Sequence, residues 1–239
     1  RRLLQYIRGT IDDKLILGGT SITHMKTWVD ASYAIHDDRK SHTGGAISFG
    51  RGVLMSKSKK QKLNTKSSTE AEVVGVSDYL GEMIWARMFI ECQGYEIEEN
   101  ILYQDNESAM KIETNGKLSC GKKSKHIDIR YFFIKDRLSS ERIQVIHCPT
   151  HKMIADFFTK PLQGNLFRLL CDVIMGRKTI QDLNDFLAKP AQERVESSIS
   201  MTDVKRPVST SLSSSPGSPA SSPVPRKRKR VMIKEETSE

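Results

Sequence analysis

The pattern of apolar and polar positions near the start of the chain predicts three consecutive strands. β-Branched, aromatic and aliphatic residues are concentrated at 26–33, 43–49 and 53–56, with a charged segment and a Gly-Arg-Gly sequence between them. Because such short connections join antiparallel neighbours, we predict a three-stranded antiparallel meander. The lysine-rich residues 57–66 that follow are either a solvated loop or a surface that contacts phosphates.

Helical periodicity dominates the chain beyond this meander. A long helix is expected from Ser67 to Gly94, because apolar residues recur there at helical spacing. Residues 101–103 predict a buried strand that leads into Asp105, and Asn106 is a good N-cap for the next helix. The remaining pattern predicts a strand at 143–147 and helices at 126–138, 151–158, 166–175 and 180–187.

The composition changes in the last part of the chain. Serine and proline dominate residues 209–225, and aromatic residues are absent after Phe186. A segment of this composition buries too little apolar surface to fold by itself, so residues 177–239 are expected to be a mostly disordered tail. The tail carries five consecutive cations: Arg226, Lys227, Arg228, Lys229 and Arg230.

The charge balance points to a polyanionic partner. The chain has 38 Lys and Arg against 29 Asp and Glu, which gives a formal net charge of +9. The four cysteines are widely spaced and form no CxxC pair, which is typical of reduced thiols in the cytosol or nucleus. Because no apolar run approaches the roughly 18 residues of a membrane span, no membrane partner is expected.

Acidic residues occur on four of the predicted elements. Asp30 lies in the first strand, Glu70 or Glu72 at the start of the long helix, Asp105 after the fourth strand and Asp156 after the last strand. Helix capping is the alternative explanation for both glutamates and for Asp105. If the carboxylates converge, they repel one another unless a cation binds between them, and oxygen ligands favour Mg²⁺ or Mn²⁺. Two such ions serve in-line displacement at phosphorus.

Seven short motifs follow one another along the chain, at residues 28–32, 38–41, 56–61, 67–72, 105–109, 125–129 and 155–162. In order and spacing they resemble the ribonuclease H domain of copia-type retrotransposon Pol polyproteins. The resemblance extends from about residue 3 to residue 176. Its first part is similar to the end of a reverse transcriptase region.

The resemblance implies an α/β, ribonuclease H-like fold with a mixed five-stranded sheet, in which two further strands join the antiparallel meander and helices flank the sheet. Residues 1–20 would be the C-terminal end of the reverse transcriptase or connection region, and residues 21–176 the ribonuclease H-like domain with its C-terminal helix. The implied activity is metal-dependent endonucleolytic hydrolysis of the RNA strand of RNA–DNA hybrids during reverse transcription. The reverse transcriptase portion of the same polyprotein is an implied partner.

The resemblance also assigns site residues. The expected catalytic and metal-binding acids are Asp30, Glu72, Asp105 and Asp156, with two Mg²⁺ or Mn²⁺ ions. Glu70 is the alternative to Glu72, and the helical wheel slightly favours Glu72 because core positions lie one and two turns beyond it. Ribonucleases H tend to carry a histidine before the last aspartate, and His147 and His151 are both candidates.

Basic residues are the expected nucleic-acid contacts. They are Lys57, Lys59, Lys60, Lys62, Lys122, Lys123, Lys125 and His126. They would contact the backbone of the hybrid, while its shape and 2′-hydroxyls set selectivity. The cations at 226–230 have the form of a nuclear import signal for an import receptor, or alternatively of a nonspecific nucleic-acid patch. The expected locations are a cytoplasmic virus-like particle and the nucleus.

Two other functions fit the same residues less well. An inactive or domesticated module would keep the fold and bind nucleic acid without cutting it, and the intact acids count against this. An integrase-type nuclease carries its acids in the order Asp, Asp, Glu, whereas here the glutamate precedes the second aspartate. The chain departs from the family at Gly44-Gly45, where a larger residue is usual, and at His42. These positions are expected to lie away from the acids.

Overall fold

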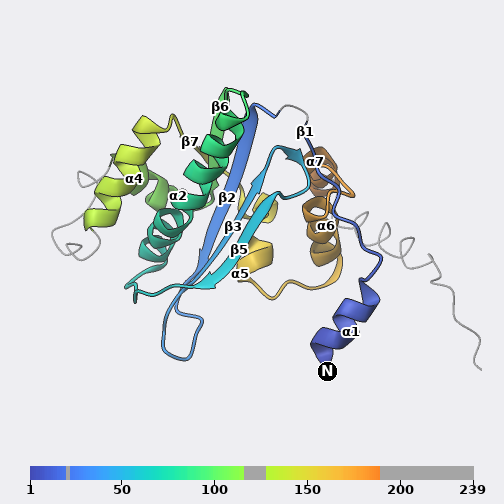
Figure 1. The fold of residues 1–239 in the computed structure, drawn as a ribbon. Coiled ribbons are helices and arrows are strands. Elements are labelled where there is room, and N and C mark those ends of the chain that lie inside the picture. Colours follow the sequence, from blue (N-terminus) through green and yellow to red (C-terminus); the bar gives the residue numbers. More distant parts are fainter. Residues whose placement is uncertain (20–21, 116–127, 189–239) are drawn as a thin grey trace, which may run out of the picture. The chain divides into compact units, whose positions relative to one another are not determined.

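The computed structural model describes residues 1–19, 22–115 and 128–188. In this part of the chain a five-stranded mixed sheet forms the centre, in the order β5-β3-β2-β6-β7 (Figure 1). The strands are β2 (His24–Ser32), β3 (His42–Ser48), β5 (Met55–Lys60), β6 (Glu99–Gln104) and β7 (Gln144–His147). The first three are antiparallel neighbours, and β6 and β7 extend the sheet in parallel with β2. This is the α/β architecture that the resemblance to ribonuclease H domains implies, so that prediction is confirmed.

Helices cover both faces of the sheet (Figure 1). On one face lie α2 (Ser68–Cys92), α3 (Glu107–Asn115) and α4 (Asp128–Ser140). The other face carries a 3₁₀ turn (Thr150–Lys152), α5 (Asp156–Thr159), α6 (Gly164–Ile174) and α7 (Ile180–Ala188). Successive residues of a strand point to opposite faces, so Val29 belongs to the apolar core under α2 and Trp28 to the core under α6 and α7.

Two element boundaries predicted from the sequence are wrong. The third strand runs over 55–60 rather than 53–56, so part of the lysine-rich segment read as a loop is an edge strand. Pairing with β3 overrides the weak local preference, and lysines on an edge strand discourage pairing with another chain. The helix predicted at 151–158 is interrupted, because Met153 has extended backbone and a buried side chain.

Segments before and after the five strands are held by contacts outside the five-stranded sheet, among them a separate two-stranded sheet. The N–H of Ile16 donates to the carbonyl of Met175 at 2.9 Å, and β1 (Gly18–Gly19) pairs with β4 (Gly50–Arg51). At the other end, Leu183 of α7 is buried in the core of that face. Among the described residues, the only element before β1 is α1 (Arg2–Gly9), and its side chains are exposed. The domain boundaries at residues 20 and 176 stay predictions.

None of the helices described is long and apolar enough to cross a membrane.

Helix α3 buries one ionisable residue completely. Glu113 lies in the last turn of α3 beside Gln104, and burial raises the pKa of its carboxyl group to about 8, while Gln104 opposes this shift in part. The Glu113 carboxyl group therefore keeps its proton to a higher pH in the folded chain than in the unfolded one.

We expect Glu113→Gln to remove a pH dependence of stability. The carboxyl pKa of about 8 in the folded chain exceeds its ordinary value of 4.5, so stability present below pH 4.5 is lost as the pH rises towards 8. The loss amounts to at most about 1.4 kcal/mol per pH unit. Chemical denaturation between about pH 5 and pH 9 measures the slope of the unfolding free energy, which should be flatter in the variant.

Glu107→Gln, at an exposed position of the same helix, is the control and should keep the wild-type slope. Equal slopes for wild type and Glu113→Gln would contradict the assignment of a raised pKa to Glu113.

Candidate active site

Three acids from three elements meet at one edge of the sheet. Asp30, Glu72 and Asp105 each offer one carboxylate oxygen, and these oxygens all lie within 4.8 Å of one another. The parallel strands β2 and β6 end on the same side of the sheet. Because Trp28 pairs with Tyr103, the residues two positions further on, Asp30 and Asp105, lie next to each other on neighbouring chain segments. Asp30 and Glu72 are buried and Asp105 is half-buried.

The two candidate glutamates have different surroundings at the start of α2. Ser67 is the N-cap and its hydroxyl accepts the N–H of Glu70 at 3.2 Å, while the Glu70 carboxylate accepts the N–H of Lys66 at 2.7 Å. This is a variant of the capping box, so Glu70 serves the helix end. Glu72 lies on the buried side of the helix and joins the cluster.

Two buried glutamines hold the backbone around the acids. The Gln61 side-chain amide donates to the Thr43 hydroxyl and to the Ala71 carbonyl, both at 2.9 Å, which ties the start of α2 to β3. The Gln104 side-chain oxygen accepts the N–H of Asp105 at 2.9 Å. Fixed backbone on both sides positions the carboxylates before any ligand binds.

The fourth predicted acid, Asp156, reaches the cluster through a lysine. Lys160 Nζ lies 2.6 Å from Asp156 Oδ1 and 3.5 Å from Asp30 Oδ1. The Thr159 hydroxyl donates to the other oxygen of Asp30. Asp156 thus faces Asp30 across an ammonium group and stands outside the group of three acids.

The cluster is electrostatically unfavourable without a cation. Burial raises the pKa of Asp30, of Glu72 well above its usual range and of Asp156 to about 6, and neighbouring carboxylates add to each shift. Burial lowers the pKa of Lys160, but the hydrogen bond to Asp156 and the surrounding acids outweigh it and raise the pKa overall. Glu72 Oε2 is buried and has no hydrogen-bond partner among the described residues. Oxygen donors with these features fit a hard divalent cation.

Comparison with known proteins decides the family. The chain is 35% identical over 175 residues to the retrovirus-related Pol polyprotein from transposon TNT 1-94 of Nicotiana tabacum, which is 73% of this chain and 13% of that protein. It is 32% identical over 170 residues to the corresponding polyprotein from transposon RE1 of Arabidopsis thaliana, 70% of this chain and 12% of that protein. The chain belongs to the copia-type retrotransposon Pol polyproteins. It spans about an eighth of the length of these relatives.

No protein-family model matches the chain. Among solved structures, LC11-RNase H1, isolated from compost by a metagenomic approach, is similar with a TM-score of 0.43 at 13% identity. The match covers 57% of this chain and 93% of that one.

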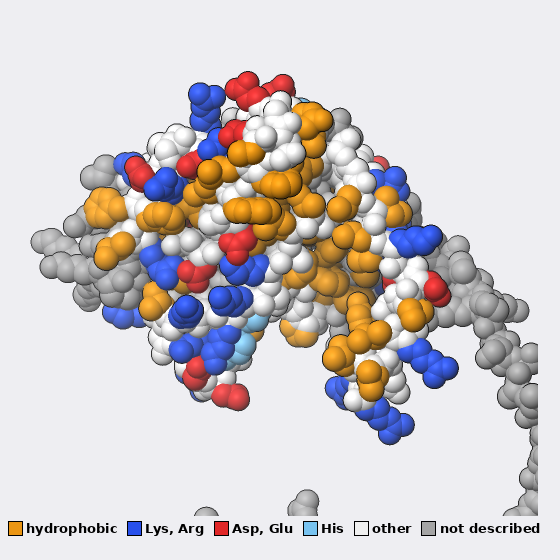
Figure 2. Space-filling model, in the orientation of Figure 1, with side chains coloured by type: hydrophobic (Ala, Val, Ile, Leu, Met, Phe, Trp, Pro, Cys, Tyr) orange, Lys and Arg blue, Asp and Glu red, His pale blue; other side chains and the backbone are white. Residues whose placement is uncertain are grey.

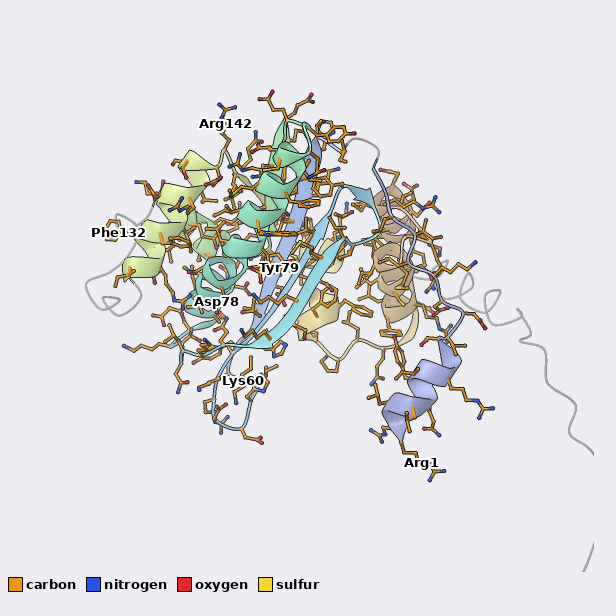
Figure 3. All side chains as sticks on the ribbon, in the orientation of Figure 1. Arg1, Lys60, Asp78, Tyr79, Phe132 and Arg142 are labelled. Atoms are coloured by element: carbon orange, nitrogen blue, oxygen red, sulfur yellow. The ribbon has the colours of Figure 1, made fainter. Side chains whose placement is uncertain are left out.

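The Pol-family departure at Gly44-Gly45 lies beside the acids, so the expectation that it lies away from them is wrong. Gly44 pairs directly with Asp30 across β2 and β3. A Cβ atom at Gly44 would lie 2.6 Å from Thr159 Cγ2 and 2.9 Å from the Ala155 carbonyl oxygen. One at Gly45 would lie 2.5 Å from the ring of Tyr79, which projects from α2 (Figure 3). The missing side chain at Gly44 is what lets α5 approach Asp30.

The second departure, His42, is also near this edge. Its Nδ1 lies 3.1 Å from His36 Nε2, its Nε2 lies 2.8 Å from the Ser58 hydroxyl, and burial together with His36 lowers its pKa. Of the candidate catalytic histidines, His147 ends β7 opposite Gln104, the residue before Asp105, and His151 lies in the 3₁₀ turn. Within the described ranges, no hydrogen bond or ion pair joins either of them to the acids.

Two of the predicted nucleic-acid contacts form ion pairs within the chain. Lys57 pairs with Glu82, and Lys60 pairs with Asp38 at 2.7 Å. Lys59 and Lys62 are exposed and form no ion pair with the described part of the chain. Figure 2 shows basic side chains interspersed with acids on this face, and Figure 3 places Lys60 at the end of β5. The strand spacing puts β5 roughly 10 Å from Asp30.

Two groups of predicted residues lie outside the described ranges. They are the basic contacts Lys122, Lys123, Lys125 and His126 and the cations Arg226, Lys227, Arg228, Lys229 and Arg230.

No role was predicted from the sequence for Lys160, Thr159, Gln61 or Gln104. The available signal was the spacing of Asp156 and Lys160, because oppositely charged residues four apart on a helix are neighbours. The two glutamines offered no signal, since each acts on backbone groups that only the folded chain brings near.

We expect Gly44→Ala to destabilise the protein by about 1–3 kcal/mol, because the added methyl group overlaps α5 and forces a shift in packing. Chemical denaturation measures the change in unfolding free energy. Gly81→Ala is the matched control: its Cβ would meet nothing within 4 Å on α2, so it should stabilise the helix by about 1 kcal/mol. Equal stability of the two variants would contradict the close approach of α5 to β3.

Proposed function

We propose that this chain is a retrotransposon ribonuclease H, which hydrolyses the RNA strand of RNA–DNA hybrids endonucleolytically during reverse transcription. The observation that carries the proposal is the convergence of Asp30, Glu72 and Asp105, with Asp156 beside them, in a chain of the Pol family. Buried carboxylates from separate elements cost folding free energy through repulsion and desolvation. A role in binding a cation explains why the fold assembles them.

The cofactor we propose is Mg²⁺ or Mn²⁺, with two ions bound. Asp30, Glu72 and Asp105 would hold one ion, and Asp156 together with Asp30 would hold the other. Such ions, when bound, activate water and stabilise the attacking and leaving oxygens at phosphorus. The protein's own contribution is to supply oxygen donors only and to hold them on backbone fixed by buried glutamines.

The substrate is proposed to be the hybrid, held by its phosphates. Lys59 of β5 and Lys62, two residues after that strand, are exposed, and β5 lies two strands from Asp30, so a duplex lying across the acids would meet them. Contacts of this kind position the backbone without reading bases, so cleavage would follow the shape of the hybrid and its 2′-hydroxyls. The reverse transcriptase portion of the polyprotein is the proposed partner that delivers the hybrid.

From the sequence alone we also propose that residues 226–230 bind a nuclear import receptor, and that the protein occurs in a cytoplasmic virus-like particle and in the nucleus.

Asp105→Asn is expected to abolish Mg²⁺-dependent cleavage of a labelled RNA–DNA hybrid while leaving hybrid binding largely intact. The amide keeps the shape of the side chain but removes a charge that the cation needs. Asp12→Asn, at an exposed position near the start of the chain and outside the acidic cluster, is the control and should cleave like wild type. Unchanged cleavage by Asp105→Asn would refute the metal-site proposal. Absence of cleavage by wild type would favour an inactive nucleic-acid-binding module.

Paired variants test which glutamate acts. Glu72→Gln should lose cleavage because its carboxylate belongs to the acidic cluster. Glu70→Gln should keep cleavage and lose helix-cap stability, by roughly 0.5–2 kcal/mol at most. Hybrid cleavage and thermal unfolding are measured on the same preparations, and the reverse pattern of activities would show that Glu70 is the acting acid.

A further inference from the structure

Lys160 is placed between two of the proposed metal-binding acids. Its ammonium group lies 2.6 Å from Asp156 Oδ1 and 3.5 Å from Asp30 Oδ1. The adjacent residue, Thr159, donates its hydroxyl to the remaining oxygen of Asp30. Both oxygens of Asp30 therefore meet donors from the end of α5. A cation that bridged Asp30 and Asp156 would have to enter the space that the ammonium group takes.

The backbone of Lys160 is anchored while its side chain has room to move. The N–H of Lys160 donates to the Asp156 carbonyl at 2.9 Å, and the chain continues in extended conformation. The side chain itself is 35% exposed. A lysine ammonium is a compact charge on a flexible stem, so it can leave the carboxylates without moving the backbone.

The charge balance of the cluster makes the ammonium group and a second divalent ion alternatives. Four carboxylates balance two divalent ions in full. An ammonium group retained at the same place would leave excess positive charge in a half-buried site, where charges interact more strongly than in water. One divalent ion at Asp30, Glu72 and Asp105 leaves the Asp156 charge for Lys160 to balance.

We propose that Lys160 is a positioning residue, an internal cation that holds Asp156 against Asp30 and competes with the second divalent ion. It follows that the two ions bind in order. The first occupies the cluster of Asp30, Glu72 and Asp105, and the second binds more weakly because it must displace the ammonium group. The inference rests on the proposed function, since it concerns the same carboxylates.

Mn²⁺ titration of the whole chain without substrate tests the proposal, with heat release and the paramagnetic signal of free Mn²⁺ as readouts. Wild type should bind one ion tightly and a second one more weakly. Lys160→Gln should tighten the second binding step about five- to tenfold and leave the first step nearly unchanged. Lys160→Arg keeps the positive charge, so the ratio of its first to its second Mn²⁺ affinity should equal that of wild type. A merely structural role of Lys160 would not require this result.

Lys152→Gln is the matched control, because Lys152 is a half-buried lysine of the preceding turn without an ion pair to the described residues. Lys160→Met, of similar length and neutral, is a second replacement should Lys160→Gln unfold, and thermal unfolding of each variant checks the fold. An unchanged second step in both neutral variants, or an arginine variant that behaves like them, would overturn the role of Lys160.

The outcome also separates this inference from the proposed function. If no variant, wild type included, binds Mn²⁺, then the metal site itself is wrong and both fall. If Asp105→Asn loses the first binding step while Lys160→Gln leaves the second unaltered, then the metal site stands and only the competition by Lys160 is refuted.

Discussion

The carboxylates of Asp30, Glu72 and Asp105 repel one another where β2 and β6 end, and the surrounding structure has to offset this repulsion. Asp30 and Glu72 are buried, and the charges of Asp30 and Asp105 raise the pKa of Glu72 and of Asp156 beyond the effect of burial. Such a cluster persists only if its carboxylates are held by groups that are themselves fixed. The parallel strands β2 and β6, the capped start of α2 and the buried glutamines supply that fixation, so the stability of the sheet core supports a locally unfavourable site.

The space around Asp30 is a second consequence of the same constraint. Gly44, the cross-strand partner of Asp30, has no side chain, and Ala155 and Thr159 of the segment around α5 occupy the volume that one would fill. This close approach brings the Thr159 hydroxyl and the Lys160 ammonium group to the carboxylates. A larger residue at this position in relatives would require α5 to lie farther from the strand. The glycine and the lysine contact therefore belong to one arrangement.

The edge strand β5 connects the acids with the surface proposed to hold nucleic acid. Its lysines keep an exposed edge from pairing with other chains and at the same time lie two strands away from Asp30. Pairing of Lys57 with Glu82 and of Lys60 with Asp38 withdraws part of this positive charge. Of the predicted contacts within the described ranges, Lys59 in β5 and Lys62 just after it stay exposed.

Most of the strands and helices, and the elements that carry the acids, could be predicted from the sequence. Strand alternation and helical period are local properties, so β2, β3, α2, the strand before Asp105 and its Asn106 cap, which accepts the N–H of Ala109 at 3.0 Å, were predictable. Which of the two glutamates joins Asp30 and Asp105 depends on the rotation of α2 against the sheet, because both satisfy the capping pattern and only Glu72 lies on the buried side with the other two acids. It also decided that Gly44 faces Asp30 and that Lys160 reaches it from 130 residues away. Contacts over such separations depend on register and packing, which local sequence patterns do not encode.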